Sequence, residues 1–217
     1  MALAIFDLDN TLLGGDSDHA WGEFLVEQGL VEPDRYQQAN DGFYQDYLRG
    51  ELDIYAYQAF ALEPLTHFEP EQLSQLHQQF MQLKIVPMML DKATELLQQH
   101  RQAGDFILII TATNRFVTGP IAEHLGVDDI LATEPELIDG RYTGQLIGTP
   151  CYQEGKVVRL NQWLEERDHD LSGSYFYSDS RNDIPLLELV DHPIAVDADE
   201  ALTQHAKAKG WSLISLR

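Results

Sequence analysis

Cysteine and basic residues are both scarce in this sequence, and each shortage excludes a class of protein. Cys151 is the only cysteine among 217 residues, so no disulfide can form within the chain, and a reducing, cytoplasmic location is expected. The 14 Lys and Arg residues stand against 36 Asp and Glu residues, which gives a net charge of −22. Because so acidic a surface repels the phosphates of nucleic acids and of anionic lipids, we expect no nucleic-acid partner and no membrane partner.

Long apolar runs and clustered metal-binding side chains are also missing. No run approaches the roughly 18 apolar residues of a membrane helix, and no basic and apolar leader typical of a signal peptide is visible. The eight histidines are scattered, which argues against a zinc site. The remaining composition, with 44% hydrophobic and 23% charged residues, is typical of a globular protein. We expect one compact domain or a domain with a large insertion, present as a monomer or a homodimer.

Short apolar segments alternate with helical patterns in the second half of the chain. Helices are predicted at 116–125, 156–166, 183–190 and 200–209, and strands at 2–6, 106–110, 130–132, 174–177, 194–196 and 211–214. Strands that alternate with helices predict an α/β fold, a doubly wound parallel sheet with helices on both faces. Turn residues in 138–144 predict a small hairpin.

The segment between the first two strands has helical spacing and no convincing alternation. One helix is predicted from Asp16 to Gly29, a second after Pro70, and a third from Leu90 to Gly104. The sequence therefore predicts a core formed by 1–13 plus 86–217, with a helical cap at 14–85 inserted after strand one.

Polar side chains follow the predicted strands at the points where the strands end. In open α/β sheets, functional residues gather beyond the carboxyl ends of the strands. Four carboxylates, a hydroxyl and a lysine are expected to meet there: Asp7, Asp9, Asp179, Asp183, Thr111 and Lys156.

Such a group of carboxylates needs a counter-charge, because the four would otherwise repel one another and raise their own pKa values. Oxygen ligands favour a hard cation such as Mg²⁺. A lysine and a hydroxyl beside the ion would neutralise and hold further anionic oxygens, which is the equipment of phosphoryl transfer on a small phosphate ester. Purely structural roles are the alternative, because aspartate is also common in turns and at helix caps. Asp7 and Asp9 would then be turn residues, and Asp183 a helix cap.

The same residues resemble the four motifs of the haloacid dehalogenase-like hydrolase superfamily, in its phosphoserine-phosphatase-like branch with a helical cap. The resemblance implies that Asp7 attacks phosphorus to form an aspartyl-phosphate and that Asp9 acts as acid and base. It also implies that Thr111 and Lys156 hold the phosphoryl oxygens. The implied Mg²⁺ ligands are Asp7, the backbone carbonyl of Asp9, Asp179 and, in support, Asp183. The implied substrate contacts are Asp16, Ala112, Thr113 and Asn182.

The cap residues bear on the identity of the substrate. Enzymes that resemble phosphoserine phosphatase place an acidic residue opposite the substrate amine and a cap arginine opposite its carboxylate. Asp16 stands at the acidic position, whereas Ala61 stands where the arginine is expected, and the only cap arginines, Arg35 and Arg49, come earlier. A phosphate ester with an amine and no carboxylate fits this pattern. Histidinol phosphate is such a molecule, which would place the enzyme in histidine biosynthesis.

Aromatic residues in the cap leave two interpretations open. Tyr36, Phe43, Tyr44, Tyr47, Tyr55, Tyr57 and Phe60 either stack on an imidazole ring of the substrate or form the core of the cap itself. Asp16 is likewise either a substrate ligand or a helix N-cap. The alternative functions are a phosphoserine phosphatase, a sugar phosphatase or phosphotransferase of the same superfamily, and a non-catalytic phospho-acceptor similar to a receiver domain.

Overall fold

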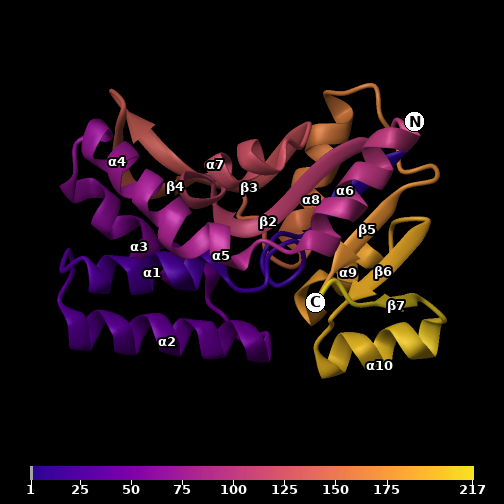
Figure 1. Cartoon of the computed structure of the whole chain (residues 1–217), viewed down its shortest axis with the longest axis horizontal. Helices are drawn as coiled ribbons and strands as arrows, with labels where there is room; N and C mark the ends of the chain where they lie inside the picture. Colours follow the sequence, from indigo (N-terminus) through magenta and orange to yellow (C-terminus); the bar gives the residue numbers. More distant parts are fainter. Residues whose placement is uncertain (1) are drawn as a thin grey trace.

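A mostly parallel sheet of seven strands forms the centre of the molecule in the computed structural model, which describes residues 2–217 (Figure 1). The strands are β1 (Leu3–Phe6), β2 (Phe106–Asn114), β3 (Asp129–Ile138), β4 (Arg141–Ile147), β5 (Tyr175–Ser178), β6 (His192–Val196) and β7 (Ser212–Ile214). Their order in the sheet is β4-β3-β2-β1-β5-β6-β7, and only the β3–β4 pair is antiparallel. The predicted α/β fold is confirmed, and the turn residues near 138–144 do form a hairpin.

Ten α-helices of the described chain surround the sheet or lie beyond its edge. They are α1 (Ser17–Glu27), α2 (Pro33–Arg49), α3 (Ile54–Leu62), α4 (Pro70–Phe80), α5 (Val86–Met88), α6 (Asp91–Ala103), α7 (Arg115–Leu125), α8 (Glu154–Glu165), α9 (Ile184–Leu187) and α10 (Glu200–Lys209). Shorter helical turns are η1 (Glu63–His67), η2 (Met81–Ile85) and η3 (Arg181–Asp183). None of the helices described here combines the length and the apolar character that crossing a bilayer requires.

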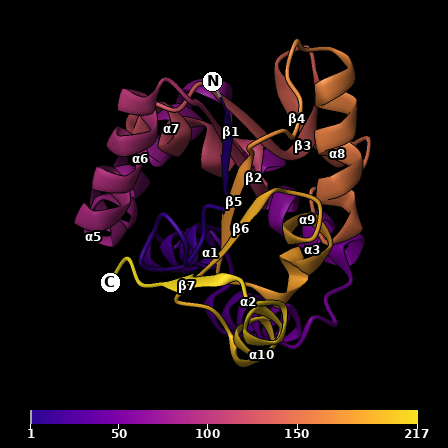
Figure 2. The ribbon, with the colours of Figure 1, turned by 90° about the vertical axis from the view of Figure 1, so that its right-hand side faces the viewer.

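Alternating side chains of the central strands supply two separate apolar cores. Ala4 and Phe6 of β1 face the side that α6 and α7 cover, whereas Leu3 and Ile5 face α8, α9 and α10 (Figure 2). Successive side chains of a strand point to opposite faces, and burial of both faces explains why these strands are continuous apolar runs rather than alternating ones. The sheet is therefore doubly wound, and its central strands are inaccessible to solvent on both faces.

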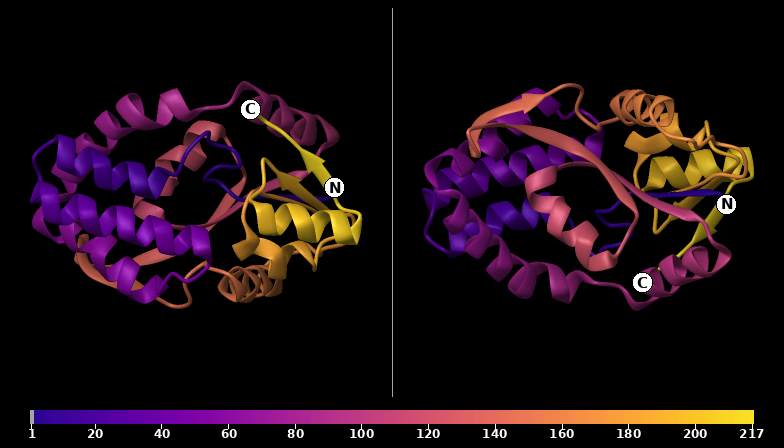
Figure 3. Two further views of the ribbon diagram at one scale, coloured as in Figure 1. Left: turned by 90° about the horizontal axis from the view of Figure 1, so that it is seen from below. Right: turned by 90° about the horizontal axis from the view of Figure 1, so that it is seen from above.

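Helices α1 to α4 lie together at one end of the molecule, and the C-terminal elements β7 and α10 lie at the other (Figure 3). The chain leaves and rejoins the sheet domain at one place, where an isolated bridge pairs Leu13 with Met89. Trp21 of α1 is 2% exposed, and its ring lies 5.1 Å from the rings of both Phe80 and Phe116. This aromatic cluster joins α1 and α4 to α7 beside the sheet. The predicted division into a core and a cap at 14–85 stays a prediction.

Strand β2 is longer than the sequence pattern indicates. The apolar run ends at Ile110, but the strand continues to Asn114 with buried polar residues. Polar residues are tolerated there because they have partners: the Thr113 hydroxyl donates to Asp9, and Thr113 N–H donates to the Thr111 hydroxyl. The extension carries Thr111, Ala112 and Thr113 directly into the site.

Candidate active site

Asp7 and Asp9 are held by the tight turn that follows β1. The amide of Asp7 donates to the carbonyl of Tyr177 at 2.9 Å, which continues the pairing of β1 with β5. Asn10 then adopts a φ of 57°, a left-handed conformation in which Asn is favoured over most other residues. Asp7 is 3% exposed and Asp9 is 8% exposed, so both carboxylates are buried at the end of the central strand.

Lys156 is the cation at the centre of the site. Its ammonium lies 2.7 Å from Asp7 Oδ1 and 2.8 Å from the carboxylate of Asp183, and the side chain is 2% exposed. The neighbouring Gly155 allows this approach, because a Cβ there would lie 2.0 Å from the carbonyl oxygen of Pro150. Helix α8 can therefore begin close against the preceding loop and deliver the lysine to the end of β1.

Two hydroxyl groups connect the remaining carboxylates to the strand ends. The Thr11 hydroxyl lies 3.5 Å from Asp7 Oδ2 and 3.3 Å from Asp179 Oδ1, within donating distance of both. The Ser178 hydroxyl donates to Asp183 at 2.7 Å. Neither hydroxyl was among the predicted site residues, although Thr11 lies two residues after Asp9 and Ser178 directly precedes Asp179. The loops after β1 and β5 are thereby joined around the lysine.

Burial dominates the electrostatics of these carboxylates. It raises the pKa of Asp7 to about 7, although Lys156 opposes the shift. Burial, with the charges of Asp7 and Asp183, raises the pKa of Asp179 well above its usual value. Burial alone would lower the pKa of Lys156, but the two carboxylates beside it outweigh that effect and raise it. One cation thus faces several buried carboxylates, and the site carries an excess of negative charge.

Asp9 is positioned independently of Lys156. Its Oδ1 accepts a 2.7 Å hydrogen bond from the amide of Ser17 at the start of α1, and its Oδ2 accepts a 2.8 Å bond from the Thr113 hydroxyl. Burial and then the charge of Asp16 raise the pKa of Asp9 to about 7. A carboxyl group with a pKa in this range can both give and take a proton near neutral pH.

The donor set fits a hard divalent cation. Asp7 and Asp179 offer carboxylate oxygens, the loop after β1 offers backbone carbonyls, and the excess negative charge favours a positive ion. No three or more His, Cys, Asp or Glu side chains of residues 2–217 form a ready-made metal cage. Mg²⁺ does not need such a cage, because it commonly takes one or two carboxylates and keeps several waters.

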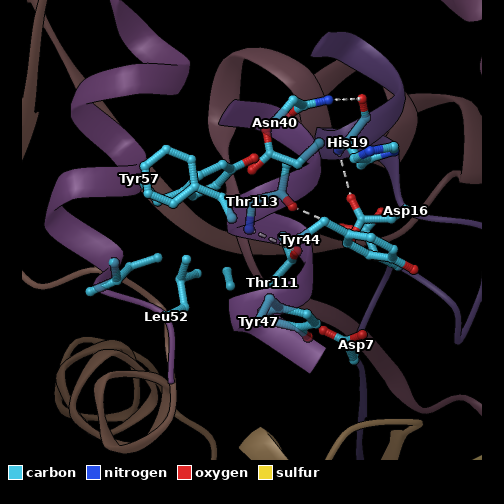
Figure 4. A pocket seen from close by; sticks show the side chains of 15 residues that line it. Asp7, Asp16, His19, Asn40, Tyr44, Tyr47, Leu52, Tyr57, Thr111 and Thr113 are labelled. Atoms are coloured by element: carbon cyan, nitrogen blue, oxygen red, sulfur yellow. Dashed lines mark hydrogen bonds between the residues drawn. The ribbon is translucent and has the colours of Figure 1, made fainter. Parts of the chain in front are cut away.

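A pocket opens from Asp7 and Asp9 toward helices α1, α2 and α3 (Figure 4). Its volume of about 40 Å³ accommodates a few water molecules. Among the predicted residues, the walls include Asp7, Asp9, Asp16, Thr111, Ala112 and Thr113. Asp18, His19 and Asn40 also line it and were not predicted. Asp18 could have been identified from the sequence as an acidic residue in the first turn of a helix that begins at the site.

Asp16 is a helix N-cap whose side chain also lines the pocket. It caps α1, where its Oδ1 accepts a 2.8 Å hydrogen bond from the amide of His19. Its pKa is raised, chiefly by burial. The N-cap role is therefore present in the structure, and the substrate role stays a prediction.

The cap aromatics likewise divide between packing and the pocket. Tyr36 stacks on Phe60 with ring centres 4.5 Å apart, and Phe43 lies 5.3 Å from Tyr57, so these half-buried rings pack on one another within the helical region. Phe43, Tyr44, Tyr47 and Tyr57 also line the pocket, whereas Tyr55 is exposed.

Side chains of the sheet domain donate hydrogen bonds to the last turn of α2. Asn182 Nδ2 donates to the carbonyl of Tyr47 at 3.2 Å, and Gln153 Nε2 donates to the carbonyl of Gly50 at 3.4 Å. Arg181 contacts the carbonyl of Arg49 in the same way, at 3.4 Å. Asn182 is not among the residues that line the pocket, and substrate contact by this residue stays a prediction.

No lysine or arginine among the described residues lines the pocket. Arg49 is exposed and pairs with Asp46 and Glu51, and Arg35 is also exposed. Ala61 is buried at 5% exposure. The part of the pocket beyond the reacting carboxylates therefore has no strong cation for a substrate carboxylate.

Comparisons with known proteins agree with this geometry. The family model of the haloacid dehalogenase-like hydrolases matches residues 4–188. A histidinol-phosphatase of Neisseria meningitidis serogroup C is 47% identical over 219 residues, covering 99% of both chains.

Two solved structures share the fold. A protein of unknown function from Bordetella pertussis Tohama I superposes with a TM-score of 0.93 at 45% identity, covering 100% of this chain and 99% of that one. A phosphoserine phosphatase with an analogue of its phospho-aspartyl intermediate superposes with a TM-score of 0.72 at 17% identity, covering 100% and 93%. Because the family model matches most of this chain, the protein belongs to the haloacid dehalogenase-like hydrolases and is a phosphatase of that family.

Proposed function

We propose that the protein is a Mg²⁺-dependent phosphomonoesterase that hydrolyses histidinol phosphate through an aspartyl-phosphate on Asp7. One observation carries the proposal. A buried carboxylate paired with Lys156 lies at the end of a pocket that is also lined by Asp9 and, farther from Lys156, by the acidic side chains of Asp16 and Asp18. From this distribution of charge we infer that phosphoryl transfer occurs at the Asp7 end of the pocket. The acidic side chains farther along would recognise a cationic leaving group.

Asp7 is placed to attack phosphorus. Its Oδ1 is engaged by Lys156, so Oδ2 is the atom that forms the new bond to phosphorus as the ester P–O bond breaks. The Lys156 ammonium offsets the charge of Asp7 and of a phosphoryl oxygen, and the Thr111 hydroxyl donates to another oxygen. Attack by water on phosphorus then releases inorganic phosphate and restores the Asp7 carboxylate.

Asp9 moves the proton in both steps. In the first step it protonates the leaving oxygen, so the product departs as a neutral alcohol. In the second step the carboxylate takes a proton from the attacking water and returns to its starting state. Thr113 and the amide of Ser17 hold the group in one orientation through both transfers.

Mg²⁺ would be held by Asp7, Asp179 and the backbone carbonyl of Asp9. Asp183 supports the site from its pair with Lys156. When bound, the ion supplies positive charge to the phosphoryl oxygens and to the crowded carboxylates.

The substrate assignment depends on which charges the pocket offers. Asp16 suits an ammonium group, and the lack of a lining arginine or lysine disfavours a substrate carboxylate. The 47% identity to a histidinol-phosphatase supports the same choice. Phosphoserine is the second candidate, because a phosphoserine phosphatase shares the fold, but its carboxylate would meet no cation here. We place the reaction in the cytoplasm and expect a monomer or homodimer acting on a free metabolite.

Replacing Asp7 with Asn should abolish turnover. The amide is a poor nucleophile, so we expect release of inorganic phosphate from an aryl phosphate to fall by about 10³-fold or more. Asp34→Asn, which removes a charge from exposed surface, is the matched control and should be unaffected. Turnover of Asp7→Asn within tenfold of wild type would contradict the nucleophile assignment.

Removal of divalent cations should stop the reaction and lower the thermal stability. Excess EDTA should eliminate phosphate release, and Mg²⁺ should restore it. Because a ligand that binds only the native state stabilises it, Mg²⁺ should also raise the Tm in a calorimetric scan without substrate. Full activity in excess chelator, or a Tm that does not respond to Mg²⁺, would remove the metal site from the proposal.

Asp16→Asn should distinguish a substrate ligand from a helix cap. Loss of a charge-assisted hydrogen bond of about 1.5–3 kcal/mol should lower kcat/KM for histidinol phosphate roughly 10- to 150-fold, and hardly change it for a neutral aryl phosphate. Asn caps a helix about as well as Asp, so a pure capping role predicts small and equal changes.

The wild-type enzyme tests the choice between histidinol phosphate and phosphoserine as the substrate. It should prefer histidinol phosphate to phosphoserine in kcat/KM, because no cation faces the carboxylate of phosphoserine. An equal or reversed preference would overturn the substrate and leave the phosphatase assignment intact.

A further inference from the structure

The end of the pocket farthest from Asp7 holds two buried hydrogen-bond acceptors, on Asp18 and Asn40. Figure 4 shows Tyr57 and Asn40 at this end, with Thr111 and Thr113 between them and Asp7. Asp18 lines the same pocket from the first turn of α1 and is 7% exposed.

The carboxylate of Asp18 has little compensation from the protein. Within residues 2–217, its one hydrogen bond of acceptable geometry is a long one, 3.4 Å from Asn114 Nδ2 to Oδ1. Burial and the charge of Asp16 raise the pKa of Asp18 well above its usual value, although the hydroxyl groups of Tyr57 and Thr113 lie near enough to oppose the shift. No lysine or arginine lines the pocket. Buried anions without a partner are costly, which points to a ligand that supplies one.

Asn40 adds a second acceptor beside it. This residue of α2 is 3% exposed, and its Nδ2 donates to the carbonyl of His19 at 2.9 Å. That bond sets the orientation of the amide and leaves Oδ1 without a hydrogen-bond donor among the described residues. The packing is specific: a Cβ on Gly22 of α1 would come within 2.5 Å of the Asn40 amide, so a glycine is needed where the two helices meet.

The surrounding groups favour a flat, nitrogen-containing group. Phe43 and Tyr57 both line the pocket, and their ring centres are 5.3 Å apart, which provides aromatic surface beside the two acceptors. His19 is the one basic side chain on the lining, and its Nε2 is occupied by Asp41 at 2.9 Å. An N–H group of the ligand would therefore meet two acceptors: the Asp18 carboxylate, whose hydrogen bond from Asn114 is long, and Asn40 Oδ1.

We propose that Asp18 and Asn40 form a second recognition point for the leaving group, which binds an N–H donor of a heteroaromatic ring while Asp16 binds the amine. This inference rests on the proposed phosphatase function. It defines the substrate class as a phosphate ester with two nitrogen groups, an amine near the phosphate and a ring N–H farther away. Asp18 is then a specificity-determining residue that makes no contact with the phosphoryl group.

The test uses three phosphate esters that differ in these groups. Histidinol phosphate carries the amine and the imidazole, phosphoethanolamine carries the amine alone, and p-nitrophenyl phosphate carries neither. Asp18→Asn should lower kcat/KM for histidinol phosphate about 10- to 150-fold and change the other two by less than threefold. Glu27→Gln, on the exposed side of the same helix, is the matched control and should change none of them.

Measurements other than turnover distinguish recognition from a structural role. Histidinol, the dephosphorylated product, should bind Asp18→Asn at least tenfold more weakly by calorimetry, while inorganic phosphate binds as in the wild type. The Tm should not fall, because the variant removes a buried and poorly compensated charge. A lower Tm together with equal decreases in kcat/KM for all three esters would indicate a structural role for Asp18 and overturn the proposal.

The wild type alone also tests the idea. It should hydrolyse histidinol phosphate at least tenfold more efficiently in kcat/KM than phosphoethanolamine. A ratio below threefold would overturn the second recognition point, although the enzyme would still be a phosphatase. If none of the three esters is hydrolysed, the proposed function itself fails, and this result is distinct from the others.

Discussion

The ion pairs of Lys156 are the interaction on which the rest of the site depends. One buried ammonium contacts Asp7 at the end of β1 and Asp183 after β5, while its own backbone belongs to α8. Three segments that are far apart in the sequence are thereby held around one point. Breaking a buried pair by removing one partner typically costs about 3–5 kcal/mol, since the other charges remain buried without compensation. Such a pair is costly to maintain, and its geometry suits a site that must receive further anionic oxygens.

The helical region above the sheet determines what reaches this point. Among its contacts with the sheet domain are hydrogen bonds from Gln153, Arg181 and Asn182 to the carbonyl groups at the end of α2. Arg181 and Asn182 follow Asp179 closely in the chain, so the contacts with the end of α2 and the carboxylates around Lys156 belong to one segment.

The sequence predicted the parts of the site that depend on local rules. Parallel strands bring their carboxyl ends to one edge, so Asp7, Thr111 and Asp179 could be placed together from the strand pattern alone. Lys156 was expected beside these carboxylates, and in the structure it lies in the first turn of α8, where the helix dipole disfavours a cation that lacks a negative partner. The pairing of Asn40 with α1 could not be predicted, because it depends on how two helices pack at Gly22, which no local pattern encodes. The polar continuation of β2 to Asn114 was missed for the same reason, since its partners come from other segments.

Phosphorylation of Asp7 is the central claim, and a rapid acid quench tests it most directly. Wild-type protein would be mixed with histidinol phosphate and Mg²⁺, quenched in acid during turnover, digested, and mapped by mass spectrometry. The account predicts a phosphoryl group on the peptide that contains Asp7, at a level that declines as substrate is consumed. Release of inorganic phosphate with an unmodified Asp7 peptide at every quench time, or with the phosphoryl group on another side chain, would contradict it.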